Sequence, residues 1–128
     1  MSDALPLVSV VDDDQSVRDG LTSLLRSLGH PVEAFASAEE FLDAGAVTRT
    51  SCLILDVAMP GMSGTELQLE LERRGHGIPI VFITAQVDDS LRPSLLARGA
   101  VECLFKPFSE AALLGALRHG IEHTGRTA

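Results

Sequence analysis

The sequence contains no tryptophan and no tyrosine, and only five phenylalanines and two cysteines among its 128 residues. Aliphatic side chains must therefore fill the core, and hydrophobic residues make up 45% of the chain. Basic residues are also scarce, since 10 Lys and Arg stand against 18 Asp and Glu, and the net charge is −8. Nucleic-acid-binding domains usually carry a basic face. Direct contact with DNA, RNA or an anionic membrane is therefore not expected.

Long apolar segments are missing as well. No run approaches the roughly 20 residues that a transmembrane helix needs, and Asp3 lies where a secretory signal would become apolar. We therefore expect a cytoplasmic protein with one domain, residues 1–128, and a core at about 7–121. Cys52 and Cys103 lie in strand-like runs, and we expect both to be reduced and buried, because cytosolic disulfides are rare.

Short apolar runs alternate with helical patterns five times along the chain. Strands are expected at residues 7–11, 32–35, 52–55, 80–83 and 101–105, each followed by a helix. Ser37 and Glu40, and again Ser63 and Glu66, have the spacing of helix capping boxes. Strands that are apolar throughout are typically buried on both faces. The pattern predicts an α/β fold, a doubly wound five-stranded parallel sheet with helices on both faces.

Chemically reactive residues follow four of the five strands. The first strand ends at Asp12 and Asp13, the third at Asp56, the fourth at Thr84 and the fifth at Lys106. Ligands of open α/β sheets bind at the carboxyl ends of the strands. A strand order of 2-1-3-4-5, taken over from known doubly wound folds, would bring the three aspartates together.

Three carboxylates in one pocket repel each other, by roughly 4 kcal/mol per pair at about 4 Å and an effective dielectric near 20. Such a site should attract a cation. An all-oxygen ligand set favours Mg²⁺ or Mn²⁺ over Zn²⁺. A carboxylate can also accept a phosphoryl group as a nucleophile. An ammonium group and a hydroxyl, which Lys106 and Thr84 provide, would help to neutralise and orient that group.

Four segments resemble the response-regulator receiver domain of two-component systems. They are VVDDD at 10–14, LDVAMPGMSG at 55–64, ITA at 83–85 and KPF at 106–108. The likeness is greatest to the FixJ-like subgroup, whose members often carry a LuxR-type DNA-binding output domain, and it extends from about residue 7 to residue 121. It implies a CheY-like fold with strand order 2-1-3-4-5.

The resemblance also implies a role for each residue of the site. These roles are phosphoacceptor for Asp56, Mg²⁺ ligand for Asp13 and Asp56, water-mediated ligand for Asp12, carbonyl ligand for Ala58, switch hydroxyl for Thr84 and phosphate-binding cation for Lys106. The bond from Lys106 to Pro107 is often cis in the family. The implied partners are a sensor histidine kinase or histidine phosphotransfer protein and a downstream protein. The implied assembly is a monomer or a phosphorylation-dependent dimer.

One position departs from the family pattern. Receivers usually have an aromatic residue three positions before the lysine, as the rotameric partner of the switch threonine, and here that residue is Cys103. Coupling then depends on Thr84 alone, or the output surface works differently. Phe105 either stands on that output surface or lies beneath the last helix, and the sequence leaves both placements open.

Three other functions are weighed against phosphoacceptance. A haloacid-dehalogenase-type phosphatase needs a second aspartate two residues after the first, where this chain has Ala58. A flavodoxin-like phosphate loop would be repelled by three aspartates. A receiver fold that binds partners without phosphorylation fits Cys103 but leaves the five polar site residues unexplained. Only seven residues, 122–128, follow Ile121, so no DNA-binding output is expected within this chain, and self-directed phosphorylation is the only catalysis expected.

Overall fold

The computed structural model describes residues 5–86 and 88–125. Within these residues, five strands form one parallel sheet in the order β2-β1-β3-β4-β5, which confirms the predicted order. In chain order the elements are β1 (Val8–Val11), α1 (Gln15–Ser27), β2 (Val32–Phe35), α2 (Ala38–Asp43), the 3₁₀ turn η1 (Ala46–Thr48), β3 (Cys52–Asp56), α3 (Gly64–Arg73), β4 (Ile80–Thr84), α4 (Leu91–Ala97), β5 (Glu102–Phe105) and α5 (Glu110–Gly125).

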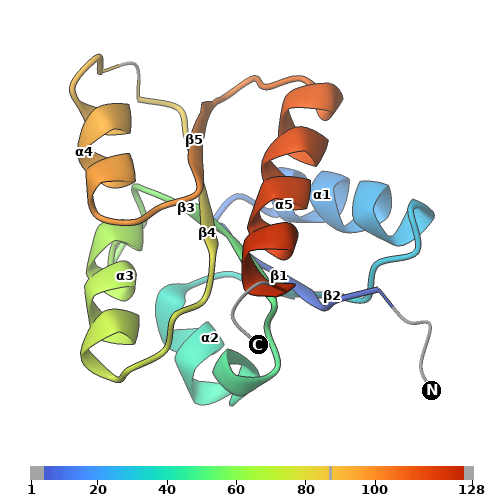
Figure 1. The fold of residues 1–128 in the computed structure, drawn as a ribbon, viewed down its shortest axis with the longest axis horizontal. Coiled ribbons are helices and arrows are strands. Elements are labelled where there is room, and N and C mark those ends of the chain that lie inside the picture. The colour runs from blue at the N-terminus through green and yellow to red at the C-terminus, as the bar shows by residue number, and fades with distance from the viewer. Residues whose placement is uncertain (1–4, 87, 126–128) are drawn as a thin grey trace.

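Helices cover both faces of the sheet (Figure 1). Helices α1 and α5 lie on one face, where Leu21, Leu25 and Leu113 pack against alternate residues of the strands. Helices α2, α3 and α4 lie on the other face, with Phe41 and Leu67 among the side chains of a second apolar cluster. The central strands β1, β3 and β4 are thus buried on both faces, as their uninterrupted apolar runs predict, whereas the edge strands β2 and β5 are partly exposed.

Local sequence signals define the helix ends. Gly29 follows α1 with φ of 92°, a left-handed conformation that favours glycine. Ser63 and Glu66 form a complete capping box at α3, and the Ser37 hydroxyl accepts a hydrogen bond from the Glu40 amide at α2. Asp14, which sequence reasoning treats as a simple helix-start charge, is the N-cap of α1. No helix in the described part of the chain is long and apolar enough to cross a membrane.

The two cysteines are free and buried, as predicted. Cys52 packs with the α1 and α5 side of the core, and Cys103 packs with the opposite side. The sheet itself therefore separates the two thiols. Burial raises the pKa of Cys52 to about 12, and burial together with the charge of Glu102 raises the pKa of Cys103.

Phe105 is half-buried at the end of β5. Its neighbour Leu104 packs toward α1 and α5, and Cys103 packs toward α3 and α4. Because side chains alternate along a strand, Phe105 belongs to the same face as Cys103. It therefore lies on the α3 and α4 side of the sheet and not beneath the last helix.

Candidate functional site

The strand register brings the acidic residues together at one edge of the sheet. Val11 of β1 pairs with Leu55 of β3, so Asp12 and Asp56, the next residues of each chain segment, lie side by side. Strand β4 continues the edge, because Asp56 pairs with Ile83. The carboxyl ends of β1, β3, β4 and β5 thus form one continuous site.

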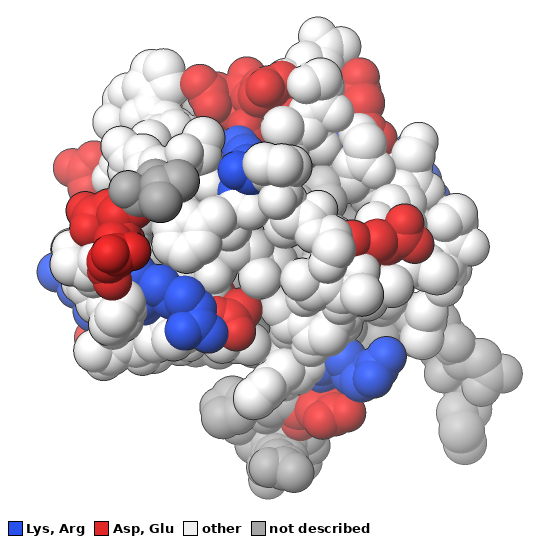
Figure 2. Space-filling model, turned by 90° about the horizontal axis from the view of Figure 1, so that it is seen from above, with Lys and Arg blue, Asp and Glu red and all other residues white. Residues whose placement is uncertain are grey.

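Asp12, Asp13 and Asp56 form a compact carboxylate cluster. One oxygen atom from each lies within 4.8 Å of the others. Asp12 is fully buried and Asp56 is 5% exposed, whereas Asp13 is open to solvent. The view from above shows acidic side chains on several sides of this face, with a basic side chain beside those at its upper edge (Figure 2). The predicted convergence of the three aspartates is therefore present in the structure.

Lys106 contacts both buried carboxylates. Its Nζ donates to Oδ2 of Asp12 at 2.9 Å and lies 3.8 Å from Oδ2 of Asp56. Its backbone amide donates to the carbonyl of Thr84 at 2.7 Å, which fixes the start of the side chain, and the bond to Pro107 is cis. Burial alone would lower the pKa of Lys106, but the hydrogen bond to Asp12 and the nearby carboxylates raise it overall.

Asp56 is strongly perturbed. Burial, followed by the charge of Asp12, raises the pKa of Asp56 from 3.8 to about 7. Lys106 and a hydrogen bond from the Ala58 amide act in the opposite direction and only partly offset the rise. A carboxyl group with a strongly shifted pKa in an accessible cluster is typical of functional sites.

The cluster fits a hard divalent cation. The donors are carboxylate oxygens, which Mg²⁺ prefers, and the buried pair carries more negative charge than Lys106 alone can balance. Burial, and after it the charge of Asp12, raises the pKa of Asp56, so a second negative charge in this pocket is unfavourable without a cation. Asp13, exposed beside the buried pair, leaves one side open for water ligands.

Thr84 and Ala58 lie at or just after the strand ends that the sequence predicts, and both make local hydrogen bonds. Thr84 is fully buried at the end of β4, and its hydroxyl accepts a hydrogen bond from the Gln86 amide at 3.0 Å. Ala58 is exposed in the loop after β3, and its backbone amide donates a hydrogen bond to the Asp56 carboxylate. The metal role of its carbonyl and the switch role of Thr84 stay predictions.

Sequence reasoning missed three residues that shape the site. The Arg18 guanidinium donates to the carbonyl of Asp12 at 2.6 Å. Glu39 accepts from the amide of Met62 at 3.0 Å and so holds the loop after β3. Gly64 lies so close to the backbone of Asp56 that an added Cβ would overlap its carbonyl oxygen. Gly64 ends the 55–64 segment that carries the family resemblance, but that segment does not reveal its close approach to Asp56. The contacts of Arg18 and Glu39 depend on how loops fold against neighbouring helices.

The sequence profile described as "Response regulator receiver domain" matches residues 8–118. The chain belongs to this family. Among curated relatives, the response regulator protein TodT of Pseudomonas putida F1 is 43% identical over 122 residues, which cover 95% of this chain and 54% of that protein. The transcriptional regulatory protein FixJ of Azorhizobium caulinodans is 41% identical over 128 residues, which cover 59% of its length. The chain thus spans a little over half the length of these relatives.

Solved structures agree with the family assignment. The response regulator StyR superimposes with a TM-score of 0.88 at 49% identity, and the match covers 95% of this chain and 62% of that one. The structure titled FixJ-N superimposes with a TM-score of 0.84 at 34% identity and covers 96% of this chain and 97% of that one. The chain is therefore a FixJ-like receiver with a CheY-like fold, a signalling domain and not a metabolic enzyme.

Proposed function

We propose that this receiver accepts a phosphoryl group on Asp56, with Mg²⁺ bound at Asp12, Asp13, Asp56 and the carbonyl of Ala58. The observation that carries the proposal is the cluster of three carboxylates within 4.8 Å of one another, joined by Lys106. The domain that performs this function corresponds to residues 1–128, with its core at about 7–121. The chain catalyses only its own phosphorylation and dephosphorylation.

The transfer step uses the Asp56 carboxylate as nucleophile. One carboxylate oxygen forms an O–P bond, while the N–P bond of a phosphohistidine donor breaks and leaves its electron pair on the imidazole nitrogen. Asp56 must be ionised to attack, and the ammonium group of Lys106, 3.8 Å away, favours that form. Lys106 and the Thr84 hydroxyl then contact the transferred group. Mg²⁺, when bound, supplies the charge neutralisation that the phosphoryl oxygens require.

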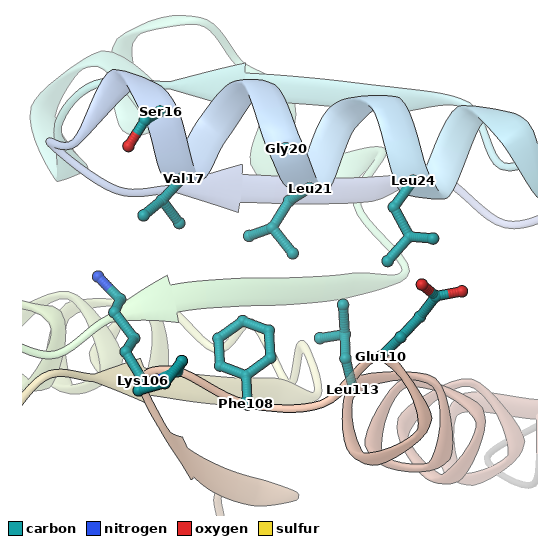
Figure 3. A pocket seen from close by; sticks show the side chains of 10 residues that line it. Ser16, Val17, Gly20, Leu21, Leu24, Lys106, Phe108, Glu110 and Leu113 are labelled. Atoms are coloured by element: carbon teal, nitrogen blue, oxygen red, sulfur yellow. The ribbon is translucent and has the colours of Figure 1, made fainter.

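The donor needs a surface near Asp56, and a groove of about 580 Å³ is lined in part by Lys106, whose Nζ lies 3.8 Å from Oδ2 of Asp56. Figure 3 shows Val17 and Leu21 of α1 pointing toward Phe108 on the opposite wall, with Lys106 at one end of the groove and Glu110 at the other. Lys106 is the lining residue that also contacts Asp12 and Asp56. An apolar groove between helices suits the apolar face of an amphipathic helix. We place the docking of a sensor histidine kinase or histidine phosphotransfer protein here.

Docking and chemistry can be tested separately. Val17→Lys should reduce phosphotransfer from a protein donor by at least tenfold and leave labelling by acetyl phosphate unchanged. Leu69→Lys, on the exposed surface of α3 at 49% exposure, is the matched control and should affect neither reaction. Equal transfer from the protein donor to both variants would place docking elsewhere.

The output surface is proposed to be the face formed by α4, β5 and α5. Arg92 of α4 and Glu102 of β5 form an ion pair at 2.7 Å on this face, and the same carboxylate accepts from the Cys103 amide. Phosphorylation would shift this face between two packings and change binding of a downstream protein. The protein is then a monomer or a phosphorylation-dependent dimer, and it functions alone or as the receiver part of a FixJ-like regulator.

The deciding experiment is intact mass spectrometry after incubation with acetyl phosphate and Mg²⁺. A phosphoryl-sized gain that is lost in Asp56→Asn and without Mg²⁺ is expected. Asp14→Asn, which removes a carboxylate from the neighbouring helix cap, should be labelled normally. Labelling of the Asp56→Asn protein would refute the site assignment.

A second function is favoured by one specific feature. Cys103 cannot report the rotation of Thr84 as an aromatic ring would, so the fold could bind its partner without phosphorylation. The absence of any mass gain, combined with partner binding by Asp56→Asn as tight as that of the wild type, would support this alternative.

A further inference from the structure

Arg18 extends from the first part of α1 back to the end of β1. It is half-buried, and its Nη1 donates to the backbone carbonyl of Asp12 at 2.6 Å. None of the motifs that define the site includes this residue. We propose that Arg18 is a positioning residue for the metal site, which holds the turn that carries the Asp12 and Asp13 carboxylates. This inference rests on the proposed Mg²⁺ site.

The contact acts on a peptide plane that both ligands share. The carbonyl of Asp12 and the amide of Asp13 belong to one rigid peptide unit, so a bond to that carbonyl orients the backbone on which the Asp13 side chain stands. Among residues 5–86 and 88–125, the Asp13 side chain makes no hydrogen bond or ion pair, and it is exposed. Its direction is therefore set by the backbone, and Arg18 is the side chain that fixes that backbone.

The other polar groups of Asp12 are held from different directions. Oδ1 accepts from the Asp14 amide at 2.8 Å, and Oδ2 accepts from Lys106 at 2.9 Å. The Asp12 amide donates to the carbonyl of Phe35 at 3.2 Å. These bonds fix the Asp12 carboxylate and the strand end, but none of them holds the carbonyl. Arg18 completes the restraint on the turn.

Orientation and charge predict opposite effects of removing Arg18. A guanidinium close to the cluster repels an incoming cation, so its loss would strengthen Mg²⁺ binding if charge were the main effect. If orientation is the main effect, loss of Arg18 lets the Asp13 carboxylate sample more orientations and weakens Mg²⁺ binding. Residues that orient metal ligands typically change affinity by about 10- to 100-fold when they are removed. Arg18 contributes a single hydrogen bond to a solvent-accessible site, so we expect its removal to weaken Mg²⁺ affinity by about tenfold, the lower end of this range.

Arg26 provides a matched control on the same helix. Its Nη2 also approaches a backbone carbonyl, that of Val32, at 3.5 Å. That contact lies at the start of β2, at the opposite end of the sheet from the carboxylates. Arg18→Met and Arg26→Met therefore remove the same charge and a similar type of bond, and only the first variant touches the metal site.

The test is a Mg²⁺ titration by isothermal calorimetry of the wild type and both variants, with urea unfolding in the absence of metal as a measure of the fold. We expect the Kd of Arg18→Met to rise about tenfold and that of Arg26→Met to stay within about twofold, with similar unfolding midpoints. If Arg18→Met does not fold, Arg18→Lys, which keeps the charge but not the planar fork, is titrated with the same expectation of weaker binding.

A metal-free measurement completes the test. In nitrogen-15 spectra of the metal-free protein, the Asp13 amide should broaden or shift in Arg18→Met and stay unchanged in Arg26→Met. Unchanged or tighter Mg²⁺ binding by Arg18→Met would overturn the positioning role. A wild type that fails to bind Mg²⁺ would overturn the proposed site and, with it, this role.

Discussion

The carboxylate of Asp56 should destabilise the metal-free protein at neutral and alkaline pH. Asp56→Asn keeps the size of the side chain and an acceptor oxygen for the Ala58 amide but removes the charge. We therefore expect the variant to be more stable than the wild type at pH 8 without divalent cations. The same substitution should remove the stabilisation that Mg²⁺ gives to the wild type, because a ligand stabilises only the state that binds it.

The raised pKa sets the size and the pH range of the effect. The folded protein holds a proton on Asp56 up to about pH 7, whereas the ordinary pKa is 3.8. Between these values the folded state binds more protons than the unfolded state, so the free energy of unfolding falls as the pH rises. Three tenfold steps at about 1.4 kcal/mol each give roughly 4 kcal/mol as the upper limit. Below about pH 4 the wild type and the variant should be nearly equal.

Urea unfolding followed by circular dichroism is the appropriate assay, because the chain has no tryptophan or tyrosine. The difference in free energy should grow from near zero at pH 4 to about 2–4 kcal/mol at pH 8. Asp14→Asn is the control, since this exposed residue caps α1 and asparagine caps as well as aspartate. It should give no stabilisation. An Asp56→Asn protein that is less stable than the wild type at pH 8 without metal would refute the reasoning.

Three further predictions concern neighbouring residues. Gly64→Ala should lower the free energy of unfolding by about 1–3 kcal/mol, because the added Cβ would overlap the carbonyl oxygen of Asp56. Gly115→Ala is the control, since a Cβ there meets nothing within 4 Å, and it should be neutral or stabilising in the same urea assay. Lys106→Ala should raise the pKa of Asp56 above its value of about 7, because Lys106 lowers it; carbon-13 titration of the carboxyl would show this, and an unchanged or lower value would contradict it. The two cysteines, both buried with raised pKa values, should react with a thiol reagent at pH 8 only after unfolding, and rapid reaction of the folded protein would contradict their placement.

Much of the fold follows from the sequence because its determinants are local or periodic. Uninterrupted apolar strands predict burial on both faces, and Ser63 with Glu66 predicts the start of α3. Strand ends shift by a single residue, as expected where hydrogen bonding fades. The strand order came from known folds and the family resemblance and not from periodicity, since each helix could return the chain to either side of β1.

The sequence predicts which residues form the candidate site, but it does not predict the different environments of Asp12 and Asp56. Position at a strand end, combined with the strand order taken from known folds, predicts that Asp12 and Asp56 meet. Their different environments depend on tertiary contacts, such as the carbonyl bond of Arg18 and the close approach of Gly64. Neither contact follows from spacing, because each depends on the path of a loop across the sheet edge.

The contacts of the two buried carboxylates separate their roles. Asp12 is held through both carboxylate oxygens and its carbonyl, so it is fixed in place and its charge is compensated. Asp56 has the Ala58 amide and a more distant ammonium group, and its pKa is raised to about 7. A carboxylate whose negative charge is less neutralised by its neighbours is stabilised more by binding a cation or by forming a bond to phosphorus. These contacts support the proposal that Asp56, and not Asp12, is the phosphoacceptor of the pair.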